Sequence, residues 1–157
     1  MKKYINVLLA IFMIFTFSSC GLDNIEPHKI VEKFDNLTEF ISKSQITKDK
    51  DLFGKREYSD DKYVGSYEAK CDKADGRDVI FGGASVKERK VKVYGNIKAE
   101  KGSAKVRIRL GDKVNLLDID ENGNFNKELD FDGGGNYIMI DYKDFSGSVT
   151  LTSEYTK

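Results

Sequence analysis

Three residue types useful for catalysis or ligand binding are scarce in this sequence. The 157 residues include one histidine, two cysteines and no tryptophan. Because His28 is the only imidazole, a Ser-His-Asp triad in the strand-rich part of the chain and a histidine-rich metal site are both excluded. We expect Cys71, which has no histidine in that part of the chain to activate it, to be buried or inert. The absence of tryptophan weakens an interpretation as a carbohydrate-binding protein.

The sequence also has no excess of charge and no long hydrophobic run. Its 26 basic and 26 acidic residues give a formal net charge of 0, which argues against a nucleic-acid partner because dedicated nucleic-acid binders are strongly basic. The longest apolar run, residues 5–17, has about 13 residues, whereas a helix that crosses a bilayer needs about 20. The run is therefore short for a membrane span, and an uncleaved anchor is the less favoured alternative.

The first 19 residues have the layout of a secretory signal peptide. Lys2 and Lys3 form a basic start, residues 5–17 are apolar, and the small side chains of Ser18 and Ser19 follow. Removal of residues 1–19 takes away two lysines and no other charge, so the formal net charge of 0 becomes −2 for the remaining chain.

The four residues Phe17-Ser18-Ser19-Cys20 resemble the lipobox of bacterial lipoproteins, in which an apolar residue and two small residues precede an invariant cysteine. The resemblance implies that Cys20 takes a diacylglyceryl group and that a signal peptidase cuts between Ser19 and Cys20. Two acyl chains suffice for stable anchoring. The expected location is the outer, extracytoplasmic side of the cell membrane, and a lipidated Cys20 leaves Cys71 without a disulfide partner.

The expected mature chain begins with a lipidated tether, residues 20–27, followed by an amphipathic helix and a polar linker in residues 28–62. A stripe of apolar residues on a helix of residues 28–42 recurs at spacings of four, three and four. This stripe consists of Ile30, Phe34, Leu37 and Ile41. It can dock on its own domain, which is the favoured interpretation, lie on a membrane surface, or bind a helix of a protein partner.

Residues 63–157 are expected to form one all-β domain, an antiparallel β-sandwich of about eight strands. Strand-like runs are separated by Gly, Asn and Asp turns at the spacing typical of sandwiches and barrels. The segments DVIFGGAS (78–85) and GGNYIMIDYKDFSGSVTL (134–151) resemble the sandwich domains of small secreted proteins from Gram-positive bacteria, a resemblance that implies no activity. The expected strands are residues 63–70, 78–85, 89–100, 103–110, 114–119, 124–131, 136–142 and 148–155.

Basic and apolar residues alternate along residues 89–110. A two-residue turn at Lys101-Gly102 would fold this stretch into a hairpin with its apolar positions on one face. The opposite face would place Lys98 directly opposite Lys105, which costs stability unless the charges are neutralised. The residues of this candidate face are Lys90, Lys92, Tyr94, Lys98, Lys105, Arg107 and Arg109.

Two explanations account for so basic a face. The favoured one is structural: a neighbouring strand would supply Glu128 and Asp130, whose carboxylates would neutralise the charges. In the other, the face attracts an anionic partner, either phospholipid headgroups or an anionic wall polymer, through its positive field.

A second hairpin is expected between residues 114–119 and 124–131. Asn122-Gly123 is a strong signal for a type I′ turn, and the resulting register would place Leu116 opposite Leu129.

The same turn resembles the first half of a calcium-binding loop, but an EF-hand needs a glutamate at the twelfth position, where Leu129 stands. A polar turn is favoured, and no metal or other cofactor is expected. The weak candidate ligands are Asp118, Asp120 and Asn122.

These observations favour a lipid-anchored extracytoplasmic protein that acts as a non-enzymatic binding or envelope-associated module. The alternative is a small envelope hydrolase or an accessory subunit of an envelope enzyme, since two carboxylates suffice for glycoside hydrolysis. A pocket that gathers two or more carboxylates would favour the hydrolase, whereas a flat sandwich would favour binding.

Overall fold

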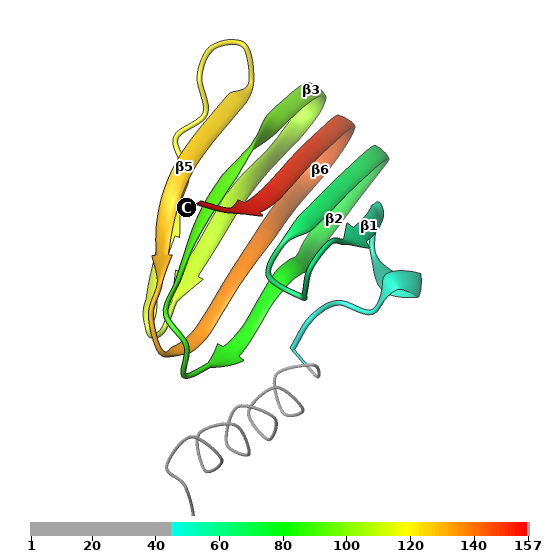
Figure 1. Ribbon diagram of the computed structural model, residues 1–157. Coiled ribbons are helices and arrows are strands. Elements are labelled where there is room, and N and C mark those ends of the chain that lie inside the picture. The colour runs from blue at the N-terminus through cyan, green and yellow to red at the C-terminus, as the bar shows by residue number, and fades with distance from the viewer. Residues whose placement is uncertain (1–44, 157) are drawn as a thin grey trace, which may run out of the picture. The chain divides into compact units, whose positions relative to one another are not determined.

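The computed structural model describes residues 45–156, which form one antiparallel sheet of six strands and a short 3-10 helix, η1 (Asp49–Asp51) (Figure 1). The strands are β1 (Lys55–Tyr58), β2 (Gly65–Ser85), β3 (Arg89–Leu110), β4 (Lys113–Leu116), β5 (Asn124–Phe131) and β6 (Gly134–Tyr155). The expected signal peptide, the lipobox and the helix of residues 28–42 lie outside the described residues. Within residues 45–156, no helix has the length and hydrophobicity required to span a bilayer.

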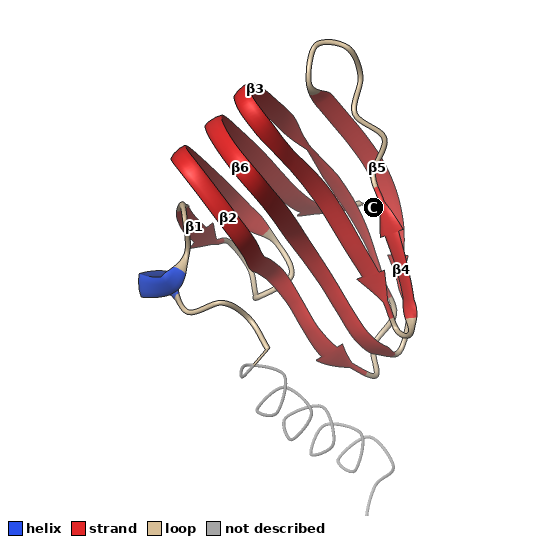
Figure 2. Ribbon diagram, turned by 180° about the vertical axis from the view of Figure 1, so that it is seen from behind, coloured by secondary structure: helices blue, strands red, loops and turns tan. Residues whose placement is uncertain are grey.

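The three long strands form the centre of the sheet. The strand order is β1-β2-β6-β3, in which β1 is short and β2, β6 and β3 are the long strands. The remaining edge of β3 pairs with two short strands (Figure 2). β5 pairs with the first half of β3, from Arg89 to Asn96, and β4 pairs with its second half, from Arg107 to Leu110.

Each long strand bends back on itself near its middle (Figure 1). The bends lie side by side, because Ala74 of β2 is opposite Phe145 of β6 and Lys101 of β3 is opposite Ser146. Positive φ angles of 65° at Gly102 and 45° at Asp144 mark these positions. The whole sheet therefore folds over into two facing layers, a sandwich-like arrangement. The first layer comprises β1, β5 and residues 65–71, 89–99 and 147–155; the second comprises β4 and residues 76–85, 103–110 and 134–142.

The bends explain why six strands form where eight were expected. Three pairs of expected strands are continuous, as β2, β3 and β6, and β1 adds a strand in a segment expected to be a linker. The Lys101-Gly102 hairpin was wrong, because β6 pairs with both halves of β3 and these halves lie in facing layers and do not pair with each other. Lys98 consequently faces Ser148, and Lys105 faces Asp141.

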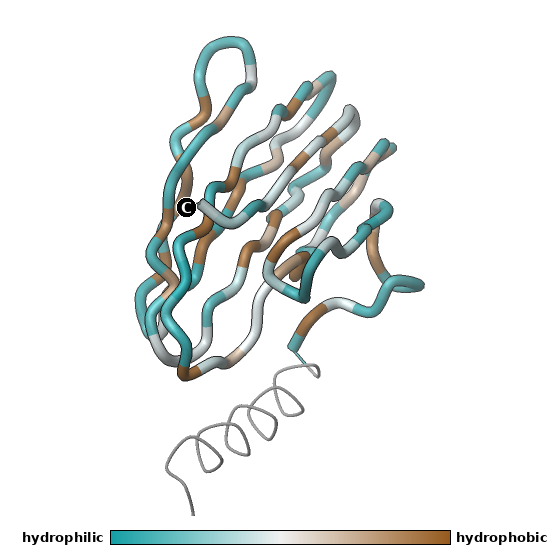
Figure 3. Tube along the Cα trace, in the orientation of Figure 1, coloured by the Kyte–Doolittle hydropathy of each residue, from teal (hydrophilic) through white to brown (hydrophobic). Residues whose placement is uncertain are grey.

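The core lies between the two layers. Val91, Val93 and Ile97 from the first half of β3 and Val106 and Ile108 from its second half are all buried, and hydrophobic residues alternate with polar ones along the long strands (Figure 3). The inward face assigned from alternation is therefore confirmed, although the hairpin is not. Full burial of a side chain of this size contributes about 1.5–3 kcal/mol.

The second expected hairpin was also wrong, because β4 and β5 pair with different halves of β3 and not with each other. A turn does form: the Gly123 amide donates to the Asp120 carbonyl over 2.9 Å. Gly123 has a φ of 82°, but Asn122 does not have a positive φ, and a type I′ turn requires two such residues. Gly123 therefore belongs to the connection that leads from β4 in the second layer to β5 in the first layer.

The weak calcium candidates are part of this turn. The Asp120 carboxylate accepts hydrogen bonds from the amides of Asn124, at 2.8 Å, and Asn122, at 2.9 Å. These bonds, that from Asn124 first, hold the pKa of Asp120 below its usual range. Across residues 45–156, no three acidic, histidine or cysteine side chains are arranged to hold a metal ion. The hydrogen bonds to the Asp120 carboxylate make these residues part of a polar turn.

Arg56 of β1 ties the two layers together at the β1 edge. β1 pairs with the first layer, where Arg56 is opposite Tyr67, yet its guanidinium donates to the carbonyl of Ile80 in the second layer over 2.8 Å. It also donates to the carbonyls of Val79 and Thr47. Only 3% of the Arg56 side chain is exposed, so these are part-buried, charge-assisted bonds, and the same guanidinium pairs with the exposed carboxylate of Asp49.

A buried polar cluster joins the layers near the bends. The Tyr67 hydroxyl donates to the Asp78 carboxylate over 2.5 Å and lies 2.9 Å from the Tyr142 hydroxyl. Burial raises the pKa of Asp78, and the hydrogen bonds from Tyr67 and the Phe53 amide oppose that shift. Burial also raises the pKa of Cys71, a partly buried free thiol. Because Asp78 is 1% exposed, we assign the cluster a structural role.

Candidate functional site: a basic and apolar sheet face

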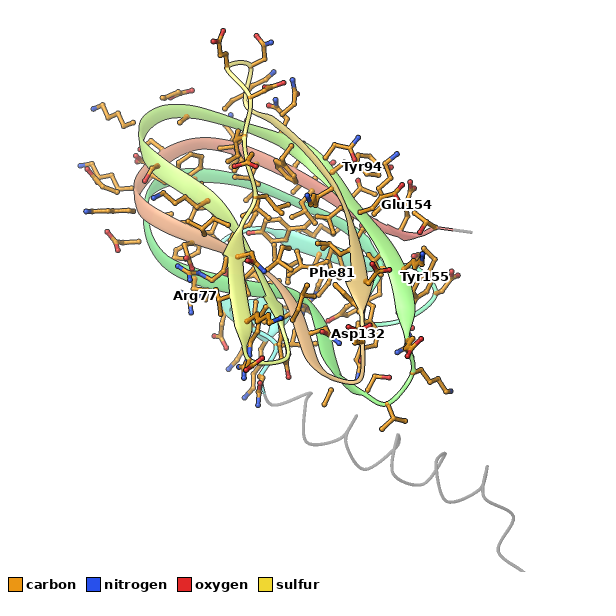
Figure 4. The ribbon with its side chains drawn as sticks, turned by 90° about the vertical axis from the view of Figure 1, so that its left-hand side faces the viewer. Arg77, Phe81, Tyr94, Asp132, Glu154 and Tyr155 are labelled. Carbon is orange, nitrogen blue, oxygen red and sulfur yellow. The ribbon has the colours of Figure 1, made fainter. Side chains whose placement is uncertain are left out.

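The bend in β3 divides the candidate basic face between the two outer surfaces. Lys90, Lys92, Tyr94 and Lys98 lie on the first layer, and Lys105, Arg107 and Arg109 lie on the second. Figure 4 shows this separation: Tyr94 and Glu154 lie on one side of the molecule, Arg77 on the other, and Phe81 between them. The seven residues therefore cannot contact one flat surface together.

Carboxylates from neighbouring strands accompany the basic residues on the first layer. Lys90 is directly opposite Asp130, with its ammonium 3.8 Å from the carboxylate, and Lys92 is directly opposite Glu128. The Tyr94 hydroxyl donates to Glu154 over 3.2 Å. For this half, the register agrees with the explanation in which Glu128 and Asp130 neutralise the lysines.

A different arrangement holds on the second layer. Asp141 of β6 lies between Arg77 of β2 and Arg107 of β3, and accepts a hydrogen bond of 2.5 Å from each. Partial burial on its own would raise the pKa of Asp141, but the two arginines hold it below its usual range. One carboxylate thus serves two guanidinium groups.

Two further cations on this layer have no carboxylate partner among the described residues. Lys105 is opposite Asp141 in the register but forms no ion pair with it within the described chain, and Arg109 donates to the carbonyl of Gly111 over 2.8 Å. The surface therefore carries four cations against one anion. We call it the second-layer basic face, consisting of Arg77, Lys105, Arg107, Arg109 and Asp141.

Apolar side chains adjoin these charges. Val114 is directly opposite Arg109, and Leu116 is directly opposite Arg107, so both share the outward face. Each is 49% exposed. The Arg109 guanidinium lies 5.9 Å from the centre of the Tyr137 ring, in the range of a cation–π contact. A row of cations bordered by exposed aliphatic side chains is suited to a surface that is both anionic and apolar.

The described chain also contains an acidic groove of about 640 Å³ at the sheet edge formed by β4 and β5. Four carboxylates line it, from Asp118, Glu128, Asp130 and Asp132. By count they meet the criterion for the hydrolase alternative, but all four side chains are exposed. A carboxylic acid that acts as a general acid near neutral pH needs burial or a close like charge to keep its proton.

The sequence did not identify two members of the second-layer basic face, Arg77 and Asp141, nor the exposed Val114 beside it. Arg77 follows Gly76 in a stretch read as a turn, and nothing local links it to Asp141, 64 residues away. The outward exposure of Val114 depends on the pairing of β4 with β3, which alternation alone does not specify. The expected processing site, Ser19 and Cys20, lies outside the described residues.

Comparisons with known proteins show only distant likeness, and only at the level of structure. No family model and no curated protein matches the chain. Among solved structures, the pre-peptidase C-terminal domain of collagenase from Bacillus anthracis is similar with a TM-score of 0.45 and 13% sequence identity, covering 59% of this chain and 90% of that domain. So distant a likeness adds nothing about a ligand or an activity.

Proposed function

We propose that this protein is a lipid-anchored, extracytoplasmic, non-enzymatic binding module whose second-layer basic face rests on an anionic phospholipid surface. One observation carries the proposal: Lys105 and Arg109 lack carboxylate partners within the described residues, while Asp141 is shared by Arg77 and Arg107. The lipid anchor rests on the resemblance of Phe17-Ser18-Ser19-Cys20 to a lipobox.

Electrostatics and apolar contact act together in this proposal. Each lysine or arginine near an anionic leaflet contributes about 1 kcal/mol, and the attraction decays within a Debye length of about 10 Å. Val114 and Leu116 favour phospholipid over an anionic wall polymer, because exposed aliphatic side chains gain by contact with acyl chains. A lipid on Cys20 would keep the domain close to that surface.

Changing Lys105, Arg107 and Arg109 together to glutamine is expected to weaken binding to anionic vesicles by roughly 100-fold at low salt, from about 1 kcal/mol for each charge. The measurement is co-sedimentation with phosphatidylglycerol vesicles at low and near-physiological salt. It uses residues 20–157 carrying Cys20→Ala, so that no lipid contributes. The change of Lys90, Lys92 and Lys98 to glutamine removes the same charge from the first layer and is expected to matter far less.

Equal losses in the two triple variants would show that only net charge matters and would contradict a role for this face. Binding of the wild-type chain to an anionic wall polymer but not to vesicles would reassign the partner. If the wild-type chain binds neither at low salt, the proposed function is wrong.

Cys20→Ala in the full chain is expected to leave an unprocessed precursor that takes no labelled lipid, because the thiolate is the proposed acceptor. The measurement is metabolic labelling with palmitate, followed by electrophoresis to separate precursor from processed chain. Cys71→Ala is the matched control and should label like wild type. Labelling of the Cys20→Ala protein at the wild-type level would rule out lipidation at this residue.

The second candidate function, a small envelope hydrolase or an accessory subunit of an envelope enzyme, is favoured by one observation, the four carboxylates along the acidic groove. Their exposure leaves the binding module as the better supported function.

A further inference from the structure

The acidic groove lies where the two layers are open to solvent. β4 of the second layer forms one wall and β5 of the first layer forms the other, and Leu117 and Asp118, at the start of the connection between them, also line it. Within the described sheet, each of these strands pairs only with β3. Both layers therefore present an unpaired strand edge beside the same groove.

The base of the groove is apolar. Ile108, Leu110, Leu117 and Leu129 contribute to its lining, and Ile108 belongs to the buried core. Lys127 is directly opposite Val93, at an inward position of β5, yet it is exposed. The interior of the fold thus reaches solvent along β5.

The rim of the groove carries more negative than positive charge. Four carboxylates line it against one ammonium, that of Lys127. Asp130 forms an ion pair of 3.8 Å with Lys90, whereas the side chains of Asp118 and Asp132 contact no basic side chain within residues 45–156. These two carboxylates are available to a cationic ligand.

From these features we infer that the acidic groove binds an extended, basic peptide segment of a partner protein by strand addition to β5. An unpaired strand edge offers main-chain hydrogen bonds to such a segment, and alternate side chains supply specificity. On a strand with alternating lysine and aliphatic residues, the aliphatic side chains would enter toward Leu117 and Leu129. The lysines would face Asp118 and Asp132.

Charge complementarity selects this occupant over two others. A second copy of the chain pairing β5 with β5 would bring both sets of carboxylates together, with a repulsive energy. An acidic peptide would meet the same repulsion. The groove lies at the sheet edge and the second-layer basic face on an outer surface, so one can be altered without the other.

The test is the affinity of a synthetic peptide of alternating lysine and valine, measured by fluorescence anisotropy with residues 20–157 carrying Cys20→Ala. The double variant Asp118→Asn and Asp132→Asn is expected to lose roughly tenfold or more in affinity at low salt. The matched control is the double variant Glu68→Gln and Glu100→Gln, which removes two exposed charges from β2 and from the β3 bend and should bind like wild type. A peptide with glutamate in place of lysine should not bind.

Hydrogen exchange locates the bound peptide. Backbone amides within residues 124–131 that do not pair with β3 should become protected on binding. Protection there together with the loss in the double aspartate variant supports the inference. Equal affinities of the double aspartate and double glutamate variants, binding without new protection in β5, or no binding by the wild-type chain would each overturn it.

Discussion

Replacing Gly102 by alanine should destabilise the domain by about 2–5 kcal/mol, whereas the same change at Gly111 should cost only about 1–2 kcal/mol. The φ angles of these residues are 65° and 61°, so the cost of a β-carbon in the left-handed region is the same at both. A β-carbon on Gly102 would lie 2.1 Å from the Asp144 carbonyl oxygen, while one on Gly111 would have no atom within 4 Å. Overpacking of this kind adds about 1–3 kcal/mol.

Thermal unfolding of both variants measures the difference. At about 4–8 °C for each kcal/mol in a domain of this size, Gly102→Ala should melt roughly 10 °C or more below wild type. If the two variants melt together, the close approach of the β3 and β6 bends does not limit stability. That result would contradict the side-by-side arrangement of these bends.

Arg56→Met is expected to cost about 3–5 kcal/mol in the free energy of unfolding. Methionine keeps much of the apolar stem but removes every donor, so the part-buried carbonyls of Thr47 and Ile80 lose the bonds they accept from the guanidinium. The Val79 carbonyl keeps its bond from the Thr47 amide, and the ion pair with Asp49 is lost. Unsatisfied buried acceptors cost about 1–3 kcal/mol each, and the costs are not additive. Denaturant unfolding is the measurement.

Two further variants distinguish the shape of the guanidinium from its charge. Arg56→Lys should recover little stability, because a single ammonium cannot reach carbonyls that a planar fork reaches together. Lys55→Met, at a side chain 81% exposed on the same strand, should change stability by less than about 0.5 kcal/mol. Full recovery in Arg56→Lys would show that charge alone acts at this edge.

Alternation of apolar and polar residues predicted which side chains of β3 face the core, but not how its two halves are connected. Gly102 has a positive φ, which glycine adopts readily. A lysine-glycine pair suits both a hairpin turn between two paired strands and a bend that carries one strand from the first layer into the second. The pairing of Lys101 with Ser146 and of Ser103 with Lys143 on β6 decides between them, and local sequence does not contain that pairing.

The candidate site was predicted in part for the same reason. Lys105, Arg107 and Arg109 share an outward face, as alternation requires, but their separation from Lys90 and Lys92 follows from the bend. Arg77 joins them only through Asp141. These contacts depend on the order of the strands, which single-strand patterns do not reveal.

The bends have a consequence for how the domain opens. β2, β3 and β6 each run through both layers, so neither layer has long strands of its own. Unfolding of one layer would therefore break the strands that form the other layer as well. We therefore expect the central strands to exchange their amide hydrogens through one cooperative opening, while β1, β4 and η1 at the margins open independently at lower free energy. Fluctuations that expose hydrophobic surface would then be confined to those margins.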